Sequence, residues 1–568
     1  MAARVIQAIS APEFARMMEV VRPPSGWTET LAVANSGGPD STALLFLLNR
    51  HIKDQKQIHS RKLSPHRLIS LTVDHDLQAT SAEMAGHASK TAEILGIPQI
   101  TTKLAWGENG NPPKPEADGA IEEVARDLRY DVFFQNMTQH NTKVLALGHH
   151  LDDQVETMLI RLGRGSGRFG LAGMRPVRRW GMGEKRWEQG VDQRLIEGMR
   201  RWIVRPLLSV GKDRILATCE ENKLDYVNDP TNFQPQLTIR NAIRHVIETG
   251  GTSSTDPKAT ELSKFPRSVA RALADINIAA EKRTDVNFSL VTDLPTLRQI
   301  SLDMTSELLD VDKKVDEFIE DNRRLSAEGS FMFSPLALKE IESPLVLEAL
   351  LYRVARFVSP EPWGSPRSEL GRRKTSMDRL IKHLHTFENF RRASNMSITV
   401  GSHVWFRLIE IRRNQLKTTL EASMIQNLNW LASRLPKHRL DDTPAGLHPL
   451  KRNVTPELLE WQKAWQAGER PPLFEVLYDC RFLVQFKLDE MTPEIRAALS
   501  NGAKIQLKPR GVWNVPQVVL VVKKKDRAIH WHLEKTPYSL PREWGLKMER
   551  DIRQGWITMK YFRPTSAI

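Results

Sequence analysis

The sequence predicts an α/β protein in which a doubly wound parallel sheet precedes a mainly helical domain and a C-terminal α+β region. Over the first 215 residues, short apolar runs alternate with helical patterns, as in sheets whose parallel strands are joined by helices. Helical periodicity with charged faces dominates residues 258–355, and strand-like alternation returns after residue 375. A length of 568 residues suits several domains. We expect domains at 1–215, 216–375 and 376–568.

Strands and helices alternate along the first domain. Strands are expected at 31–35, 68–73, 99–104 and 143–147, with helices at 42–48, 82–95 and 121–137 between them. Later stretches with the alternation of strands are 397–407, 482–487 and 517–523, and 359–375 is typical of a linker or exposed loop. In parallel sheets of this kind, ligands bind beyond the carboxyl ends of the strands. A site is therefore expected in the segments that come directly after the strands.

The sharpest feature is the segment S-G-G-P-D-S, residues 36–41, between the first strand and the first helix. Gly37 and Gly38 let the backbone approach a ligand closely, and the start of the helix offers unpaired N–H groups to phosphate. Ser36 and Ser41 can add hydroxyl hydrogen bonds, while Asp40 supplies a hard oxygen for Mg²⁺. No Gly-Lys-Ser/Thr follows, so the loop is not of the Walker type. The pattern predicts a phosphate site; the alternative is a plain strand-to-helix turn.

A second cluster, G-H-H-L-D-D-Q-V-E-T at 148–157, directly follows the fourth strand. Two histidines end the strand, and three acids lie on the first turns of the next helix. These side chains are His149, His150, Asp152, Asp153 and Glu156. Acids at a helix start can simply cap it. Histidines and acids together opposite a phosphate loop favour a Mg²⁺ and substrate-orienting site, and the usual spacing of a zinc site is missing.

Basic residues are concentrated beside this site. Residues 161–214 hold fourteen Lys/Arg against five Asp/Glu, with glycines between the first arginines. Such a stretch suits a loop that closes over an anionic substrate, or alternatively a disordered basic loop. Arg126 and Arg129 lie three apart on the 121–137 helix, so they share one face, as a solvated surface pair would also do.

These motifs resemble those of a known family. S-G-G-x-D-S after a first strand is the signature of the N-type ATP pyrophosphatases, or PP-loop family, which split ATP into AMP and pyrophosphate. H-H-x-D-D-Q-x-E-T, then R-G-S-G-x-x-G-L-x-G-M and R-P-L-L at 205–208, resembles the tRNA(Ile)-lysidine synthase family within it. D-P-T-N at 229–232 and T-I-R-N-A-I-R at 238–244 extend the resemblance, which covers residues 30–245, under half of the chain.

The resemblance implies an ATP-dependent carbon–nitrogen ligase. Such an enzyme adenylates the C2 carbonyl oxygen of the wobble cytidine in a tRNA(Ile) with a CAU anticodon, releasing pyrophosphate. The ε-amine of L-lysine then expels AMP to give lysidine. The resemblance implies nucleotide binding by Ser36, Gly37, Gly38, Pro39, Asp40, Ser41 and Asp74, with Asp40 also binding Mg²⁺. It implies catalytic roles for Asp40, Arg126, His150, Asp152, Asp153, Glu156 and Arg205. The two arginines would hold tRNA or triphosphate, and the histidine and helix acids would orient lysine and accept its proton.

Two positions depart from the family pattern. Asn35 precedes the loop where a small or apolar residue is usual, and Gln78 stands where an arginine is common. Beyond residue 245 the match is only in general character, and we expect 216–375 and 376–568 to bind the rest of the tRNA. Trp405, Trp513 and Trp531 could stack on bases, although core packing is the alternative role for each.

The composition of the chain limits its partners and its cellular compartment. A net charge of +14 and a pI near 9.6 favour a polyanionic partner, or otherwise only serve solubility. Cys219 and Cys480 form no C-x-x-C pair, which argues against a disulfide framework and a thiolate zinc site and favours a reducing compartment. No apolar run is long enough to cross a membrane. The first acid is Glu13, which gives the N-terminus only a weak transit-peptide character, and residues 11–20 fit an ordinary amphipathic helix better. Since lysidine belongs to bacterial and organellar decoding, the resemblance implies a mitochondrial location in a eukaryote, despite this weak signal, and a cytoplasmic one otherwise.

Three rival functions remain open at this point. A tRNA thiolase of the same fold would ordinarily use paired cysteines, which the sequence lacks. A small-molecule synthetase, such as an NAD synthetase, would not explain the basic charge or the long C-terminal half. A non-catalytic RNA-binding protein could have inherited the fold, but Asp40, Asp152 and Asp153 are all retained.

Overall fold

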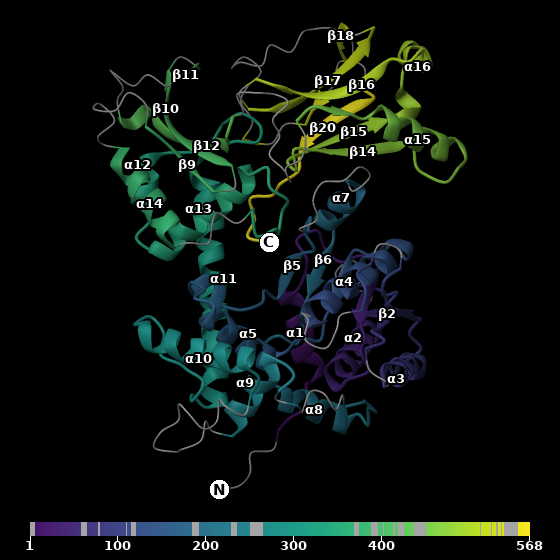
Figure 1. The fold of residues 1–568 in the computed structure, drawn as a ribbon, viewed down its shortest axis with the longest axis vertical. Coiled ribbons are helices and arrows are strands. Elements are labelled where there is room, and N and C mark those ends of the chain that lie inside the picture. The colour runs from purple at the N-terminus through teal and green to yellow at the C-terminus, as the bar shows by residue number, and fades with distance from the viewer. Residues whose placement is uncertain are drawn as a thin grey trace. The chain divides into compact units, whose positions relative to one another are not determined.

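The chain forms two compact units in the computed structural model (Figure 1). Unit 1 comprises residues 1–179 and 201–308, and unit 2 comprises residues 180–200 and 309–568. The three-domain division predicted from the sequence, with boundaries at 215 and 375, stays a prediction. The structure describes residues 6–568 except 58–64, 78–79, 109–110, 115–120, 184–191, 229–233, 235, 250–264, 369–373, 388–395, 402, 413–414, 418–424, 437–449, 512, 524, 530–531, 535–536 and 539–554.

Unit 1 is built on a six-stranded sheet in the order β3-β2-β1-β4-β6-β5. Its strands are β1 (Thr30–Ala34), β2 (Arg67–Asp74), β3 (Gln99–Lys103), β4 (Val144–Ala146), β5 (Val177–Arg179) and β6 (Trp202–Val204). All neighbours pair in parallel except β5, which is antiparallel to β6. The chain runs outward from β1 through β2 to β3 and resumes at β4 on the other side of β1. The strand order therefore reverses between β1 and β4, the position where such sheets bind ligands.

Helices connect and cover these strands, and α2, α3 and α4 pack against β2 (Figure 1). The helices of the sheet region are α1 (Ala11–Val20), α2 (Pro39–Gln57), α3 (Ser81–Ile94), α4 (Ile121–Gln139), α5 (Leu151–Gly163), α6 (Arg168–Leu171) and α8 (Lys212–Glu221). Strand β1 has an apolar, fully buried centre at Leu31, Ala32 and Val33, as expected for a strand covered on both faces. The predicted doubly wound parallel sheet is thus confirmed, while the short strands β5 and β6 were not predicted.

A helical layer completes unit 1. It consists of α9 (Ile239–Glu248), α10 (Arg267–Lys282) and the first part of α11 (Leu294–Asn322). Apolar side chains of α5, such as Met158 and Leu162, share one core with Leu273 and Ile276 of α10. Gly163 is needed at this contact, because a Cβ there would lie 2.9 Å from a side-chain carbon of Ile276. Helix α5, which begins at the predicted histidine–acid cluster, is therefore held by packing along its length.

Unit 2 contains three sheets and several helices, and its described strand pairs are antiparallel except for the parallel pair β19 and β20. One sheet has the order β11-β10-β12-β8-β7, with β9 on β10; the others are β13-β16-β17-β18 and β14-β15-β20-β19. The strands are β7 (Arg323–Arg324), β8 (Phe331–Phe333), β9 (Ser397–Val400), β10 (Val404–Arg412), β11 (Gln415–Lys417), β12 (Leu428–Arg434), β13 (Arg452–Asn453), β14 (Leu473–Tyr478), β15 (Phe482–Lys487), β16 (Lys504–Arg510), β17 (Val515–Val522), β18 (Lys525–Ala528), β19 (His532–Leu533) and β20 (Ile557–Tyr561). Its helices are α7 (Asp192–Arg200), α12 (Pro335–Lys339), α13 (Pro344–Val358), α14 (Lys374–His385), α15 (Thr455–Gln466) and α16 (Pro493–Ser500), with short 3₁₀ turns η4 (Ile425–Asn427) and η5 (Leu488–Glu490).

Several sequence expectations for unit 2 need adjustment. The stretch 397–407 is a hairpin, β9 and β10, rather than one strand. Strands β7 and β8 arise within the segment whose periodicity indicated helices. Residues 359–368 are not an exposed loop, because Trp363 is buried in a cluster with Met199 and Leu477. Strands near 482–487 and 517–523 are confirmed as β15 and β17. No helix in the described part of the chain has the length and apolar character that a membrane crossing requires.

The segment 180–200 leaves the sheet of unit 1 between β5 and β6 and belongs to unit 2. Its helix α7 is fixed there by buried charge. Asp192 pairs with Arg452, with side chains 6% and 5% exposed, and its carboxylate also accepts from the N–H of Leu477 at 3.1 Å. Arg200 donates two hydrogen bonds to Glu475, at 2.7 and 2.8 Å. The two strands β5 and β6 are thus joined by a segment anchored in unit 2.

Asp192→Ala is expected to lower the free energy of unfolding by about 3–5 kcal/mol, because it leaves the buried Arg452 guanidinium without this carboxylate. The measurement is urea unfolding followed by circular dichroism. Asp310→Ala is the matched control, since Asp310 forms an exposed pair with Lys314, and such pairs contribute at most about 1 kcal/mol. Equal losses of unfolding free energy in the two variants would contradict the stabilising role of the buried Asp192–Arg452 pair.

Candidate active site

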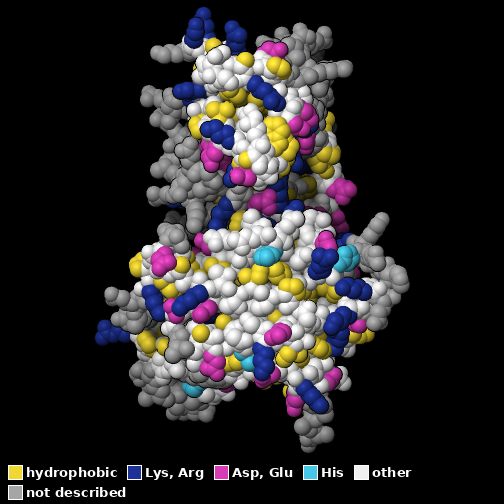
Figure 2. Space-filling view, turned by 90° about the vertical axis from the view of Figure 1, so that its right-hand side faces the viewer, with side chains coloured by type: hydrophobic (Ala, Val, Ile, Leu, Met, Phe, Trp, Pro, Cys, Tyr) yellow, Lys and Arg dark blue, Asp and Glu magenta, His cyan; other side chains and the backbone are white. Residues whose placement is uncertain are grey.

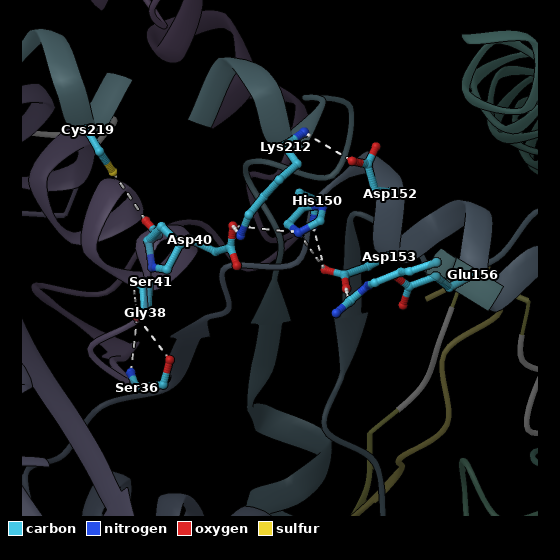
Figure 3. Close-up of polar contacts among 12 residues, drawn as sticks. Ser36, Gly38, Asp40, Ser41, His150, Asp152, Asp153, Glu156, Lys212 and Cys219 are labelled. Atoms are coloured by element: carbon cyan, nitrogen blue, oxygen red, sulfur yellow. Dashed lines mark hydrogen bonds and ion pairs between the residues drawn. The ribbon is translucent and has the colours of Figure 1, made fainter. Parts of the chain in front are cut away.

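The phosphate loop follows β1 and is shaped by its own short hydrogen bonds. Gly37 has φ +79°, and a Cβ there would lie 2.9 Å from the carbonyl oxygen of Met84, so only glycine fits. The N–H of Ser36 donates to Oγ of Ser41 at 3.1 Å, and the two hydroxyls lie 3.2 Å apart (Figure 3). The carbonyl of Gly37 accepts from the N–H of Val227 at 2.9 Å. The predicted loop is therefore a formed turn leading into α2.

Asn35, which departs from the family pattern, holds this turn in place. Its side chain is buried, and Oδ1 accepts from the N–H of Gly37 at 3.0 Å and from Oγ of Ser41 at 3.3 Å. Its Nδ2 donates to Oγ of Ser70 at 3.2 Å and to the carbonyl of Ala88 at 3.1 Å. An apolar residue could make none of these bonds. The amide therefore ties the loop to β2 and α3.

Asp40 lies at the centre of the site, between two groups that come from different strands (Figure 3). Its Oδ1 is 2.5 Å from Nζ of Lys212, which begins α8, and 3.6 Å from Nε2 of His150, which follows β4. The close approach depends on Gly148, where a Cβ would lie 3.1 Å from the carbonyl of Asp40. The loop after β1 and the histidines after β4 therefore meet across the reversal in strand order.

Asp152 and Asp153 point to different partners although they are adjacent. Asp152 receives two hydrogen bonds from Arg298 of α11, at 2.6 and 2.8 Å. The backbone N–H of Lys212 also donates to Asp152, at 3.4 Å. Asp153 accepts from the N–H of His150 at 3.0 Å and so caps α5. Asp152 thus connects α5 with α8 and α11, whereas Asp153 stays within the histidine cluster.

Glu156 and Asp153 share two arginines of α9. Arg244 donates to Glu156 and lies 3.6 Å from Asp153, while Arg240 lies 3.9 Å from Glu156 and 4.0 Å from Asp153. Burial raises the pKa of Glu156 against the lowering effect of Arg244. Burial also tends to raise the pKa of Asp153, but His150 and the neighbouring positive charges outweigh it and the pKa is lowered. Arg240 and Arg244 belong to the R-N-A-I-R segment, which explains why that motif accompanies the acids.

The second histidine of the pair lies in a different environment. Nδ1 of His149 accepts from Nε of Arg205 at 3.3 Å, and Arg205 is almost fully buried. Burial and the charge of Arg205 lower the pKa of His149 to about 3, so the ring is neutral. Burial and Arg178 lower the pKa of Arg205 itself to about 10. Burial would raise the pKa of Tyr130, yet Arg178 and Arg205 lower it overall. A cluster of positive charge therefore surrounds His149 and Tyr130.

The remaining predicted residues lie apart from these ion pairs. Asp74 ends β2, and its Oδ1 accepts from the N–H of Asp76 at 3.0 Å in a turn. Arg126 is exposed on α4, with its guanidinium 5.8 Å from the ring centroid of Tyr130. Gln78, the Asp229–Asn232 motif and Trp531 are outside the described residues. Lys212 and Arg298 were not predicted, because neither lies in a recognisable motif.

The donor set fits a Mg²⁺ ion that is shared with phosphate oxygens. Among the described residues, no group of three or more His, Cys, Asp or Glu is arranged to hold a metal. Mg²⁺ is usually bound by one or two carboxylates together with substrate phosphates, rather than by a protein cage. Asp40 is the carboxylate placed for this, since it opens α2 directly beside the phosphate loop.

Positive charge is not spread evenly. On the face seen in Figure 2, Lys and Arg side chains lie scattered among Asp and Glu rather than in one continuous area. Inside unit 1, by contrast, Arg205 has Arg126, Arg161 and Arg178 close enough to lower its pKa. This arginine cluster concentrates positive charge beside His149 and Tyr130.

The sequence is similar to those of known proteins. Residues 11–249 match the family model described as a PP-loop domain. The chain is 30% identical to a tRNA(Ile)-lysidine synthase of Rhodopseudomonas palustris over 53% of this chain and 72% of that protein. It is 34% identical to the protein of that name from Bacillus licheniformis, over 38% of this chain and 39% of that one, and 33% identical to the one from a Bradyrhizobium species, over 48% and 65%. The match thus spans less than two thirds of the last two relatives.

His149→Gln is expected to weaken the dependence of stability on pH. The folded pKa of about 3 lies below the ordinary 6.5, so between these values the unfolded chain binds a proton that the folded chain does not. Stability is therefore lost as pH falls below 6.5, by up to about 1.4 kcal/mol per pH unit for one group. Urea midpoints at pH 7.5 and 5.5 measure this, with the exposed His140→Gln as control. If the stability of the His149 variant depended on pH as strongly as that of the wild type, the lowered pKa of His149 would be refuted.

Proposed function

This chain belongs to the tRNA(Ile)-lysidine synthase family, and from this membership we propose that it is an ATP-dependent carbon–nitrogen ligase that makes lysidine. Its substrates would be ATP, L-lysine and a tRNA(Ile) whose CAU anticodon carries the cytidine to be modified. The observation that carries the proposal is the meeting of the phosphate loop with the histidine–acid cluster. Both occupy the strand ends at the reversal between β1 and β4, with Asp40 and His150 3.6 Å apart.

In the first step, the C2 carbonyl oxygen of the cytidine attacks the α-phosphorus of ATP and pyrophosphate leaves. The amides of residues 36–41 and the start of α2 would hold the phosphates, as helix N-termini commonly do. Asp40 would bind Mg²⁺, which supplies positive charge where negative charge develops on the leaving group. The Asn35 amide keeps the loop in shape by binding the N–H of Gly37.

In the second step, the ε-amine of lysine attacks C2, and AMP leaves with the oxygen it had acquired. The amine must arrive near acidic groups and lose a proton. We propose that Asp153 and Glu156 orient the ammonium of lysine. His150 lies between Asp40 and Asp153 and is a candidate to accept the proton. Asp152 is bound by Arg298 and by the backbone of Lys212. We therefore assign Asp152 a positioning role.

The tRNA must present an unstacked base to this site. The arginine cluster around His149 is suited to anionic groups, because Arg205 is buried and lies among further arginines. We propose that Arg205 and the exposed Arg126 contact phosphates of the anticodon loop or of ATP. The thiolase alternative is not favoured, since Cys219 and Cys480 are both buried and separate. The three relatives compared with this chain are bacterial, so the predicted mitochondrial location draws no support from them.

The direct test incubates the purified protein with Mg²⁺-ATP, labelled lysine and a tRNA(Ile) transcript with a CAU anticodon. We expect label in the tRNA together with AMP and pyrophosphate. Asp40→Ala should reduce the rate at least about 10²-fold, because charge on the leaving group is then no longer offset. A transcript with a UAU anticodon, which lacks the cytidine, is the control and should remain unlabelled.

The outcomes separate the alternatives. ATP-dependent release of pyrophosphate without lysine in the tRNA would retain adenylation and reject lysine as the nucleophile. Binding of tRNA without any ATP turnover would favour a non-catalytic RNA-binding protein.

A further inference from the structure

Lys212 brings a positive charge to the phosphate loop from a distant part of the chain. It is the first residue of α8, and its ammonium reaches Asp40 across the phosphate loop, with Nζ 2.5 Å from Oδ1 (Figure 3). No other Lys or Arg has a described ion pair with the loop carboxylate. His150, which follows the neighbouring strand β4, approaches the same oxygen. The loop's only carboxylate is thus neutralised by a cation that comes from far along the chain.

The backbone of Lys212 is held independently of its side chain. Its N–H donates to Asp152, which Arg298 fixes in turn. Farther into α8, Thr218 and Cys219 are buried, and Sγ of Cys219 contacts the carbonyl of Pro39 at 3.6 Å. Helix α8 is therefore packed against the start of α2. The backbone of Lys212 is thus fixed by contacts that do not involve its ammonium.

The ammonium of Lys212 can also exchange Asp40 for another anionic partner. The side chains of Lys212 and Asp40 are 31% and 30% exposed, unlike the sealed pair of Arg452 and Asp192 at 5% and 6%. A partly exposed pair gains little from its mutual attraction, and a lysine is a compact charge on a flexible four-carbon chain. Moving the ammonium from Asp40 to a nearby phosphate therefore costs little.

We propose that Lys212 is a pyrophosphate-binding catalytic residue whose ammonium rests on Asp40 and transfers to the β- and γ-phosphates of bound ATP. As the cytidine oxygen bonds to the α-phosphorus, the bond from that phosphorus to the bridging oxygen breaks and its electron pair goes to pyrophosphate. Lys212 neutralises the charge that appears there. The resting contact with Asp40 meanwhile prevents an unpaired carboxylate from repelling incoming phosphate. The catalytic part of this inference rests on the proposed function, whereas the binding of pyrophosphate by Lys212 does not depend on it.

A purely structural role, in which Lys212 only neutralises Asp40, makes a different prediction. In that case the lysine matters only while the carboxylate is present. Removing the charge of Asp40 would then make Lys212 dispensable for phosphate binding. Comparing the lysine variant in the presence and absence of that carboxylate therefore separates the two roles.

The experiment measures binding of inorganic pyrophosphate and of ATP by calorimetry in EDTA, without divalent cations, tRNA or lysine. We expect Lys212→Met to weaken pyrophosphate binding at least about tenfold and Asp40→Asn to strengthen it. In the Asp40→Asn background, Lys212→Met should again weaken binding about tenfold. Lys212→Arg should retain most of the affinity, and Lys53→Met, at an exposed lysine of α2, should leave it unchanged.

Loss of the lysine effect in the Asp40→Asn background would overturn the proposal, as would wild-type affinity in Lys212→Met. Circular dichroism and thermal unfolding establish that each variant is folded, and Lys212→Arg covers the case in which Lys212→Met does not fold. Pyrophosphate binding needs neither tRNA nor lysine. A lysine-dependent affinity without lysidine formation would therefore retain the role of Lys212 and reject only the proposed function.

Discussion

The pairing of β1 with β4 is the constraint on which the site depends. Val33 lies opposite Ala146 in this parallel pair, so the two strands end at the same edge of the sheet. The segments that leave the two strands must then share one space, and Gly148 gives the room, since a side chain there would press on the backbone of Asp40 and Ser41. The phosphate loop and the histidine pair are neighbours for this reason, although about a hundred residues of sequence separate them.

Charge compensation extends the site beyond the sheet. Each acid near the loop has a basic partner that comes after β6 in the chain. The pairs are Asp40 with Lys212, Asp152 with Arg298, and Glu156 with Arg244. A buried or half-buried carboxylate is costly without such a partner, so the acids of α5 need α8, α9 and α11 to be in place. The helical layer of unit 1 is accordingly part of the electrostatics of the site, in addition to packing on α5.

The same dependence on tertiary contact explains which parts of the site could be predicted from the sequence. The strands β1, β2 and β4 correspond to apolar runs bounded by turns, and the loop and the acids belong to motifs whose residues are close in sequence. Lys212 and Arg298 could not be predicted, because each is an isolated basic residue that acquires its partner only in the folded chain. Asn35 stood out as a departure from the family pattern, but its role depends on the positions of Ser70 and Ala88. The hairpin at 397–407, by contrast, could have been predicted, because Gly401-Ser402 lies between its two strands in the sequence, next to His403 with φ +56°.

The two adjacent histidines face different charged groups. Successive side chains of an extended backbone point in opposite directions, and His150 is extended, with φ −129° and ψ −178°. His149 consequently faces Arg205, whereas His150 faces Asp40 and Asp153. The first side is rich in positive charge, whereas on the second side the acids share the positive partners Lys212 and Arg244. The proposed reaction joins a nucleotide to an amine, and a dipeptide at the end of one strand places the arginine cluster beside the acids to which the amine is proposed to bind.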